Sequence, residues 1–252
     1  AHRFDEEGEK MQIDPAAYLE DWWTLVDEVL EKTYPLGDGS GRRMQIKLVG
    51  CDSGGKAGVT TKAYQFWRAL RDDEEGRQHH LRFQLVKGDP SPKAPTYRRD
   101  YPDSHRKDRH SGARGDVPVV FLQSNTLKDQ VSGMLGRTEA AGGMVNFPIW
   151  YDEKGKQEDI NWLYMQLTAE IRTDKGWEAP SGKRNEAWDL LYYCMGLCRD
   201  PRIALDRIDW TKPPLWAAEW DQNVLVFAAN DNRPFTRPSA KKSLDDLGAL
   251  LA

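Results

Sequence analysis

The chain has 252 residues, enough for one large domain or for one domain with an extension. Its formal net charge is −4, and it contains 10 Trp, 9 Tyr and 7 Phe. This aromatic content excludes a wholly disordered chain, and no apolar run approaches the ~20 residues that a membrane-spanning helix needs. Three cysteines are too few for a disulfide framework, so we expect the chain to work in a reducing cytoplasm.

The first third of the chain predicts an alternation of helices and strands. Asp14-Pro15 is typical of a helix start, and helical spacing of apolar residues follows over 15–33. Residues 44–51 indicate a buried strand, 60–71 a helix and 81–87 a second strand. The order strand, helix, strand predicts a right-handed parallel crossover.

The stretch 88–116 is rich in Pro, Gly and charge, and is too long for an ordinary connection. Its basic part is a candidate contact for DNA phosphates, because Lys and Arg neutralise phosphates without reading sequence; a solvated insertion explains it equally well. Lys87, at the preceding strand end, is a further candidate, although a solvated lysine is the simpler interpretation. The candidate phosphate contacts are Lys87, Arg98, Arg99, Arg106, Lys107 and Arg109.

The rest of the chain predicts a third strand, three helices and an extension. The strand spans 117–123, a short strand is expected at 143–147, and helices are expected at 126–137, 158–172 and 184–198. From residue 211 onward Pro pairs, Trp residues and a polar run predict an extension with a flexible end. We therefore divide the chain into a domain at 1–210 and an extension at 211–252.

Two aspartates stand out as candidate ligands of a metal ion. Asp52 ends a buried strand and precedes two glycines, and in an open parallel sheet ligands bind beyond the carboxyl ends of the strands. A turn aspartate that caps the next helix is the plainer alternative. Asp189 lies at the edge of the apolar face of its helix, where an unpaired charge is costly, so we expect it to pair with a cation.

Glu186 can share the face of Asp189, because it lies three residues earlier. A solvated acid that favours the helix dipole is the better interpretation of Glu186, so it is the weakest of the three candidate ligands. Together, a strand-end Asp and a helical Asp suit Mg²⁺ or Mn²⁺, which prefer oxygen ligands. Two such ions would activate water and stabilise the leaving oxygen in phosphodiester cleavage.

At this point a series of short motifs resembles one family, the C-terminal nuclease domain of the large terminase subunit of lambda-type tailed bacteriophages. The motifs occur in order over residues 15–198. They are D-S-G-G at 52–55 with Thr60, Tyr64 and Phe66, V-K-G at 86–88, S-N-T-L-K-D at 124–129, F-P at 147–148, Q-L-T-A-E at 166–170, and R-N-E-A-W-D at 184–189 with Tyr192 and Tyr193.

The resemblance implies an α/β, ribonuclease-H-like mixed sheet flanked by helices, and a metal-dependent endonuclease that cuts concatemeric double-stranded DNA with two Mg²⁺ or Mn²⁺ ions. The family's acids carry over onto Asp52 and Asp189. The implied partners are double-stranded DNA, the small terminase subunit, an ATPase domain of the parent protein, and the portal or procapsid through the extension. The implied location is the cytoplasm of the infected bacterial host.

The sequence departs from the family pattern at one point. Such domains supply a third acid from a strand before the first helix, and no such acid-bearing strand precedes Asp14. A phosphate-binding loop of the G-x-x-x-x-G-K-[ST] type is also missing, so the ATPase is expected elsewhere in the parent protein. The alternative hypothesis is therefore a non-catalytic, nuclease-like module that grips DNA or docks on the portal or small subunit.

Overall fold

The computed structural model of the chain describes residues 3–4, 10–102, 115–139, 142–147, 156–157 and 159–228. Its centre is a four-stranded mixed sheet with strand order β5-β6-β8-β7. Strands β5 (Val49–Asp52), β6 (Phe83–Asp89) and β8 (Val119–Gln123) are parallel, and β7 (Tyr97–Asp100) runs antiparallel to β8. The parallel pairing of the first two predicted strands is thereby confirmed.

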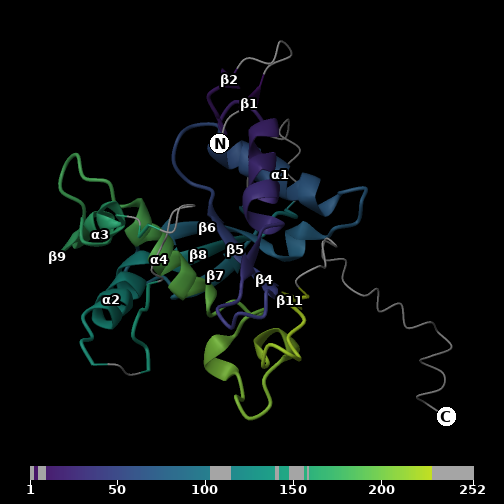
Figure 1. Cartoon of the computed structure of the whole chain (residues 1–252). Coiled ribbons are helices and arrows are strands. Elements are labelled where there is room, and N and C mark those ends of the chain that lie inside the picture. The colour runs from purple at the N-terminus through teal and green to yellow at the C-terminus, as the bar shows by residue number, and fades with distance from the viewer. Residues whose placement is uncertain are drawn as a thin grey trace, which may run out of the picture.

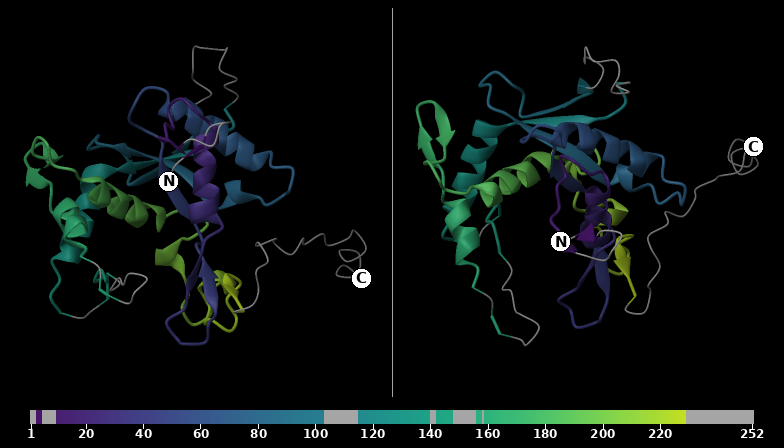
Figure 2. Two further views of the ribbon diagram at one scale, coloured as in Figure 1. Left: turned by 45° about the horizontal axis from the view of Figure 1, so that its top comes forward. Right: turned by 90° about the horizontal axis from the view of Figure 1, so that it is seen from above.

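Helices cover both faces of this sheet, so the fold is of the predicted α/β class (Figures 1 and 2). Helix α1 (Val59–Arg71) packs with Leu85 and other buried residues on one face. Helices α2 (Ser124–Leu135) and α4 (Glu186–Leu197) pack on the other face with Val86. Leu85 and Val86 serve opposite cores because successive strand residues point to opposite faces of a sheet.

Smaller elements surround this centre. The N-terminal hairpin is β1 (Arg3–Phe4) with β2 (Lys10–Met11), and a three-stranded sheet has the order β11-β4-β3. Helix α3 (Asn161–Leu167) and the hairpin β9–β10 project beside α2 in Figure 2. The remaining bounds are β3 Thr33–Pro35, β4 Arg43–Gln45, β9 Ile171–Thr173, β10 Gly176–Glu178 and β11 Val226–Phe227, with short helices at Glu20–Trp23, Val26–Leu30, His79–Leu81, Leu205–Arg207 and Leu215–Ala217.

The predicted helix at 15–33 is shorter and irregular, since it begins at Glu20 with a 3₁₀ turn and closes with a π turn. The reason is that side chains of the helix bond to the chain before it. The Asp14 N–H donates to the Asp21 carboxylate at 2.7 Å, and the Trp22 indole donates to the Pro15 carbonyl at 2.8 Å. These bonds fold the preceding segment back instead of extending the helix.

The predicted strand at 44–51 is two strands in different sheets. β4 pairs with β3 and β11, whereas β5 pairs with β6. Within the expected loop 88–116, residues 97–100 form β7, and the predicted strand at 143–147 has no strand structure. The helix expected at 158–172 ends at Leu167, because β9 begins only four residues later.

The extension begins with described residues and continues beyond them. Its strand β11 pairs with β4, so residues 226–227 lie against the domain. Residues 229–252, which include the expected flexible end, lie outside the described residues. No helix in the described ranges is long and apolar enough to cross a membrane.

Candidate active site

Asp52 lies at the carboxyl end of β5, paired in register with Val86 of the central strand β6. Its side chain is exposed, and its Oδ1 accepts a hydrogen bond from the Gly54 N–H at 2.8 Å. Gly55 follows with φ +91°, a conformation that favours glycine. The sequence Asp-Ser-Gly-Gly therefore turns the chain sharply away from the strand and leaves the carboxylate accessible at the sheet edge.

Asp189 lies in the first turn of α4, and its side chain is 35% exposed. Its Oδ1 lies 2.7 Å from the Nζ of Lys128, and its Oδ2 accepts a longer hydrogen bond of 3.3 Å from Asn185. Burial raises the pKa of Asp189; Lys128 acts in the opposite direction, and the charges of Glu170 and Asp52 add to the rise.

The structure brings Asp52 and Asp189 to the same place. Tyr193 lies one helical turn after Asp189, and its hydroxyl donates to Oδ2 of Asp52 at 3.3 Å. The charge of Asp52 also contributes to raising the pKa of Asp189, as described above. Helix α4 thus passes the end of β5 and brings two carboxylates that are far apart in the sequence close enough for their charges to interact.

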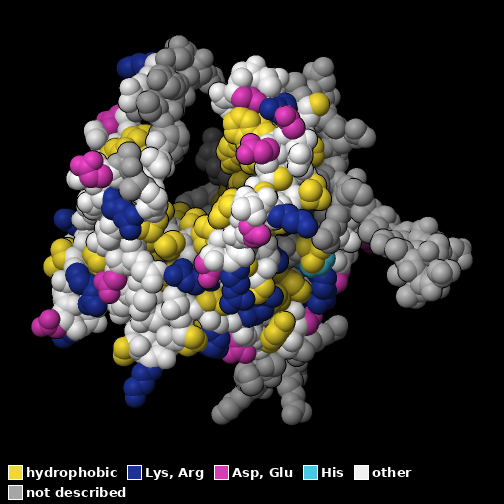
Figure 3. Space-filling model, turned by 90° about the horizontal axis from the view of Figure 1, so that it is seen from below, with side chains coloured by type: hydrophobic (Ala, Val, Ile, Leu, Met, Phe, Trp, Pro, Cys, Tyr) yellow, Lys and Arg dark blue, Asp and Glu magenta, His cyan; other side chains and the backbone are white. Residues whose placement is uncertain are grey.

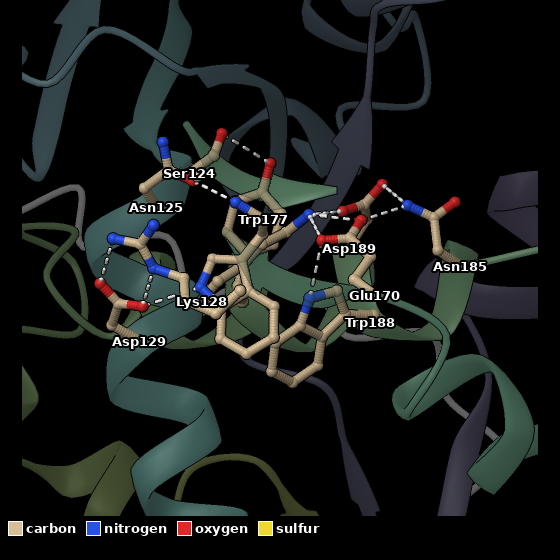
Figure 4. A network of polar contacts seen from close by, with 12 residues as sticks. Ser124, Asn125, Lys128, Asp129, Glu170, Trp177, Asn185, Trp188 and Asp189 are labelled. Carbon is tan, nitrogen blue, oxygen red and sulfur yellow. Dashed lines mark hydrogen bonds and ion pairs between the residues drawn. The ribbon is translucent and has the colours of Figure 1, made fainter. Parts of the chain in front are cut away.

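A network of buried polar side chains lies next to Asp189 and contacts it through Lys128 and Asn185 (Figure 4). Glu170, only 4% exposed, has each carboxylate oxygen 2.8 Å from the Nζ of Lys128. The same carboxylate accepts from Asn185 at 2.6 Å and from the Trp188 indole at 3.1 Å. Figure 4 shows these side chains converging between α2 and α4.

The sequence alone did not predict that Lys128 and Glu170 form a buried pair beside Asp189. Glu170 is more simply a surface acid when the sequence alone is considered, yet it is buried. Lys128 occurs within the S-N-T-L-K-D motif, but nothing in its spacing singles it out. The available signal was the coincidence of both residues with two of the family-like motifs.

The other predicted residues lie in different environments. Glu186 is exposed and pairs with Arg184 at 3.1 Å, as a solvated acid in a first helical turn would. Lys87 follows Val86 on β6, and its Nζ lies 3.5 Å from the Thr60 hydroxyl.

Two of the predicted phosphate contacts are strand residues with acidic partners. On β7, Arg98 pairs with Asp100 at 2.6 Å, and Arg99 pairs with Asp200 at 2.9 Å. Arg106, Lys107 and Arg109 lie outside the described residues.

Residues 3–210 match the family model described as terminase large subunit gpA, endonuclease domain. The chain belongs to this gpA endonuclease family. Membership supports a nuclease module of DNA packaging, in agreement with the resemblance seen in the short motifs.

Other comparisons add no functional information. A stretch of 84 residues is 25% identical to part of the protein SUBSTANDARD STARCH GRAIN 4, chloroplastic, of Oryza sativa subsp. japonica. That match covers 32% of this chain and 4% of the rice protein, so the chain spans a small fraction of that relative. No solved structure matches the chain.

The charges of the side chains around Asp52 and Asp189 suit a divalent cation. Glu170 and Asp189 share the single ammonium of Lys128, and the charge of Asp52 acts on Asp189, so three carboxylates and one ammonium leave two negative charges when all four groups are ionised. Asp52 and Asp189 supply the hard carboxylate oxygens that Mg²⁺ and Mn²⁺ prefer, and such ions keep several waters. Among the described residues, no three His, Cys, Asp or Glu side chains are grouped to hold a metal. As a donor set, the two carboxylates alone would hold a cation that keeps most of its waters.

Proposed function

We propose that this domain is a metal-dependent endonuclease that cuts concatemeric double-stranded DNA during packaging. The observation that carries the proposal is the meeting of Asp52 and Asp189 at the end of β5, in a member of the gpA endonuclease family. A carboxylate pair at a sheet edge is accessible to a DNA backbone, whereas the buried network around Glu170 is not.

Asp52 and Asp189 would hold the cation, and their neighbours would keep them in place. Gly54 and Tyr193 fix the two oxygens of Asp52, and Lys128 fixes one oxygen of Asp189. When bound, Mg²⁺ or Mn²⁺ activates water and stabilises the leaving oxygen of a phosphodiester. The two-ion form of this chemistry needs carboxylate oxygens beyond these two, which the resemblance assigns to a strand preceding the first helix.

Plasmid cleavage tests the proposal. The chain is incubated with supercoiled DNA and Mn²⁺, Mg²⁺ or EDTA, and nicked product is measured. We expect metal-dependent nicking that falls at least ~100-fold in Asp52→Asn and in Asp189→Asn, because each removes a charged ligand. Glu186→Gln is the matched control, since Glu186 is a solvated acid of the same helix turn. Full nicking by either Asn variant contradicts the assignment.

The second candidate function is a non-catalytic module that grips DNA or docks on a packaging partner. It is favoured by one observation: among the described residues, no three or more His, Cys, Asp or Glu side chains are grouped so that they could hold a metal ion. Under this hypothesis the folded chain binds DNA, and no divalent cation produces nicking. The same plasmid experiment, with a DNA-binding measurement beside it, separates the two functions.

Partners and location follow from the proposed packaging role. We propose contacts with DNA phosphates through Lys87 and the basic segment that includes Arg98, Arg99, Arg106, Lys107 and Arg109. We also propose docking on the portal or procapsid through residues 211–252, and association with the small terminase subunit and an ATPase domain. The corresponding site of action is the cytoplasm of the infected bacterial host.

A further inference from the structure

The ammonium of Lys128 contacts three carboxylate oxygens. Its Nζ lies 2.8 Å from both carboxylate oxygens of Glu170 and 2.7 Å from Oδ1 of Asp189 (Figure 4). An ammonium has three hydrogens to donate, so these contacts use its capacity. The Lys128 side chain is only 8% exposed. Lys128 is therefore placed to act on Asp189 and not on a DNA phosphate directly.

Each carboxylate oxygen of Glu170 accepts two hydrogen bonds. One oxygen accepts from Lys128 and Asn185, and the other accepts from Lys128 and the Trp188 indole. A buried carboxylate with every oxygen hydrogen-bonded is a poor candidate for a metal ligand, because binding would break bonds that offset its burial. Its geometry suits a different role, which is to hold the Lys128 ammonium at a fixed point.

The two oxygens of Asp189 differ as a result. Oδ1 is held at 2.7 Å by a buried ammonium, whereas within the described part of the chain Oδ2 accepts the longer 3.3 Å hydrogen bond from Asn185. We propose that Lys128, clamped by Glu170, is a positioning residue that fixes the Asp189 carboxylate and leaves Oδ2 to bind the divalent cation. This inference rests on the proposed function, because it deepens the role of the same site.

A charge-matched double variant separates positioning from mere structural support. Lys128→Met with Glu170→Gln removes one positive and one negative charge, so the net charge around Asp52 and Asp189 is unchanged. It also removes both charges of the buried Lys128–Glu170 pair together, so neither is left buried alone, which is the main hazard of changing either residue singly. Asp189, whose side chain is 35% exposed, loses its ion pair with Lys128. A fall in cation affinity then reports the loss of the Lys128 contact with Asp189 and not a change in the net charge around the two aspartates. Arg172→Met, which removes an exposed ion pair with Asp129 on the same helix, is the control.

The readouts are Mn²⁺ affinity, measured by the electron paramagnetic resonance signal of free Mn²⁺, and plasmid nicking. Partners that orient metal ligands typically contribute 10–100-fold to metal affinity or activity. We expect the double variant to stay folded by circular dichroism, to bind Mn²⁺ about 10–100-fold more weakly and to nick DNA more slowly by a similar factor. Unchanged affinity and nicking in the folded double variant would overturn the proposal.

Lys128→Arg keeps the test decisive if the double variant does not fold. Arginine retains the charge, but its planar guanidinium cannot bring one nitrogen to three oxygens as an ammonium does. We expect Lys128→Arg to fold and to bind Mn²⁺ about 10-fold more weakly. Affinity equal to that of the unsubstituted chain would overturn the proposal.

Failure of the proposed function is distinguishable from failure of this inference. An unsubstituted chain that binds Mn²⁺ without nicking DNA contradicts the nuclease function, while the Mn²⁺ affinities of the variants still decide the role of Lys128. An unsubstituted chain that binds no Mn²⁺ overturns both. Normal binding and nicking with no effect of the variants overturns only the positioning role.

Discussion

At the scale of single residues, the approach of α4 to the sheet depends on Gly88, at the end of β6. A Cβ atom built on Gly88 would lie 2.6 Å from the Tyr192 hydroxyl and 2.8 Å from the Ser124 hydroxyl. Neither side chain has room to move freely, since the two hydroxyls lie 3.3 Å from each other. Glycine is thus required here by the closeness of the helices that carry the site.

Gly88→Ala is expected to lower the free energy of unfolding by about 1–3 kcal/mol, the usual cost of overpacking. Urea denaturation followed by circular dichroism measures it. Gly133→Ala is the matched control, because nothing lies within 4 Å of a Cβ at this position of α2. Alanine there is expected to stabilise the helix by up to about 1 kcal/mol. A Gly88→Ala variant as stable as the control would contradict the packing described here.

At the scale of elements, Asp200 ties β7 to the chain after α4. It is fully buried, and its carboxylate accepts from the Tyr97 hydroxyl at 2.8 Å, from Arg99 at 2.9 Å and from Arg202 at 2.8 Å. Arg202 also reaches Gln84 of β6 at 2.6 Å. One carboxylate therefore joins an edge strand, a central strand and the end of the helix that carries Asp189.

Asp200→Asn is expected to destabilise the fold by about 1.5–3 kcal/mol, because a neutral amide weakens the charge-assisted hydrogen bonds from the partly exposed Arg99 and Arg202. Thermal and urea unfolding measure the loss. Asp209→Asn, at an exposed turn, is the control and is expected to change stability far less. Equal stability of the two variants would show that the Asp200 network is not needed to hold β7 in place.

The same carboxylate predicts how stability depends on pH. Burial alone would raise the pKa of Asp200, but hydrogen bonds from Arg202 and Tyr97 outweigh it and hold the pKa well below its ordinary value. A lowered pKa gives stability that is present above the unfolded value of about 3.9 and is lost as the pH falls below it. The unsubstituted chain should therefore lose more stability than Asp200→Asn between about pH 5 and pH 3; parallel losses would contradict this.

Local sequence pattern predicted the strands and helices whose burial is continuous, such as β6, β8, α1 and α4. Local pattern failed where the neighbouring strand, and not the local sequence, decides which sheet a segment joins. Residues 44–51 are uniformly strand-like, but Gln45 pairs across from Thr33 whereas Val49 pairs with Phe83, in another sheet. Likewise Asp52 and Asp189 are candidates that local context predicts, whereas the proposed role of Lys128 and Glu170 rests on their contact across 42 residues of sequence.

At the scale of the whole molecule, charge is mixed and not concentrated. On the face seen in Figure 3, Lys and Arg side chains are interspersed with acidic and apolar ones. With a net charge of −4, the chain as a whole does not attract DNA. Under the proposed function, binding to DNA depends on a small number of basic residues near the site; Lys87 is a candidate, because it follows Val86, the residue of β6 that pairs with Asp52.

Lys87→Gln is expected to weaken DNA binding several-fold for all sequences alike and to reduce the slope of log affinity against log salt by about 1, as loss of one phosphate contact does. Fluorescence anisotropy with labelled duplex DNA at several salt concentrations measures both. Lys212→Gln, at an exposed site in the extension, is the control. An unchanged slope in Lys87→Gln would remove Lys87 from the DNA interface.

The measurement that tests the central claim most directly is Mn²⁺ binding to the unsubstituted chain, Asp52→Asn and Asp189→Asn, with Glu186→Gln as control. If the two aspartates share one cation, both Asn variants lose most of the Mn²⁺ affinity and Glu186→Gln keeps it, because only the first two face the site. Undiminished Mn²⁺ affinity in either Asn variant would contradict a shared site for Asp52 and Asp189.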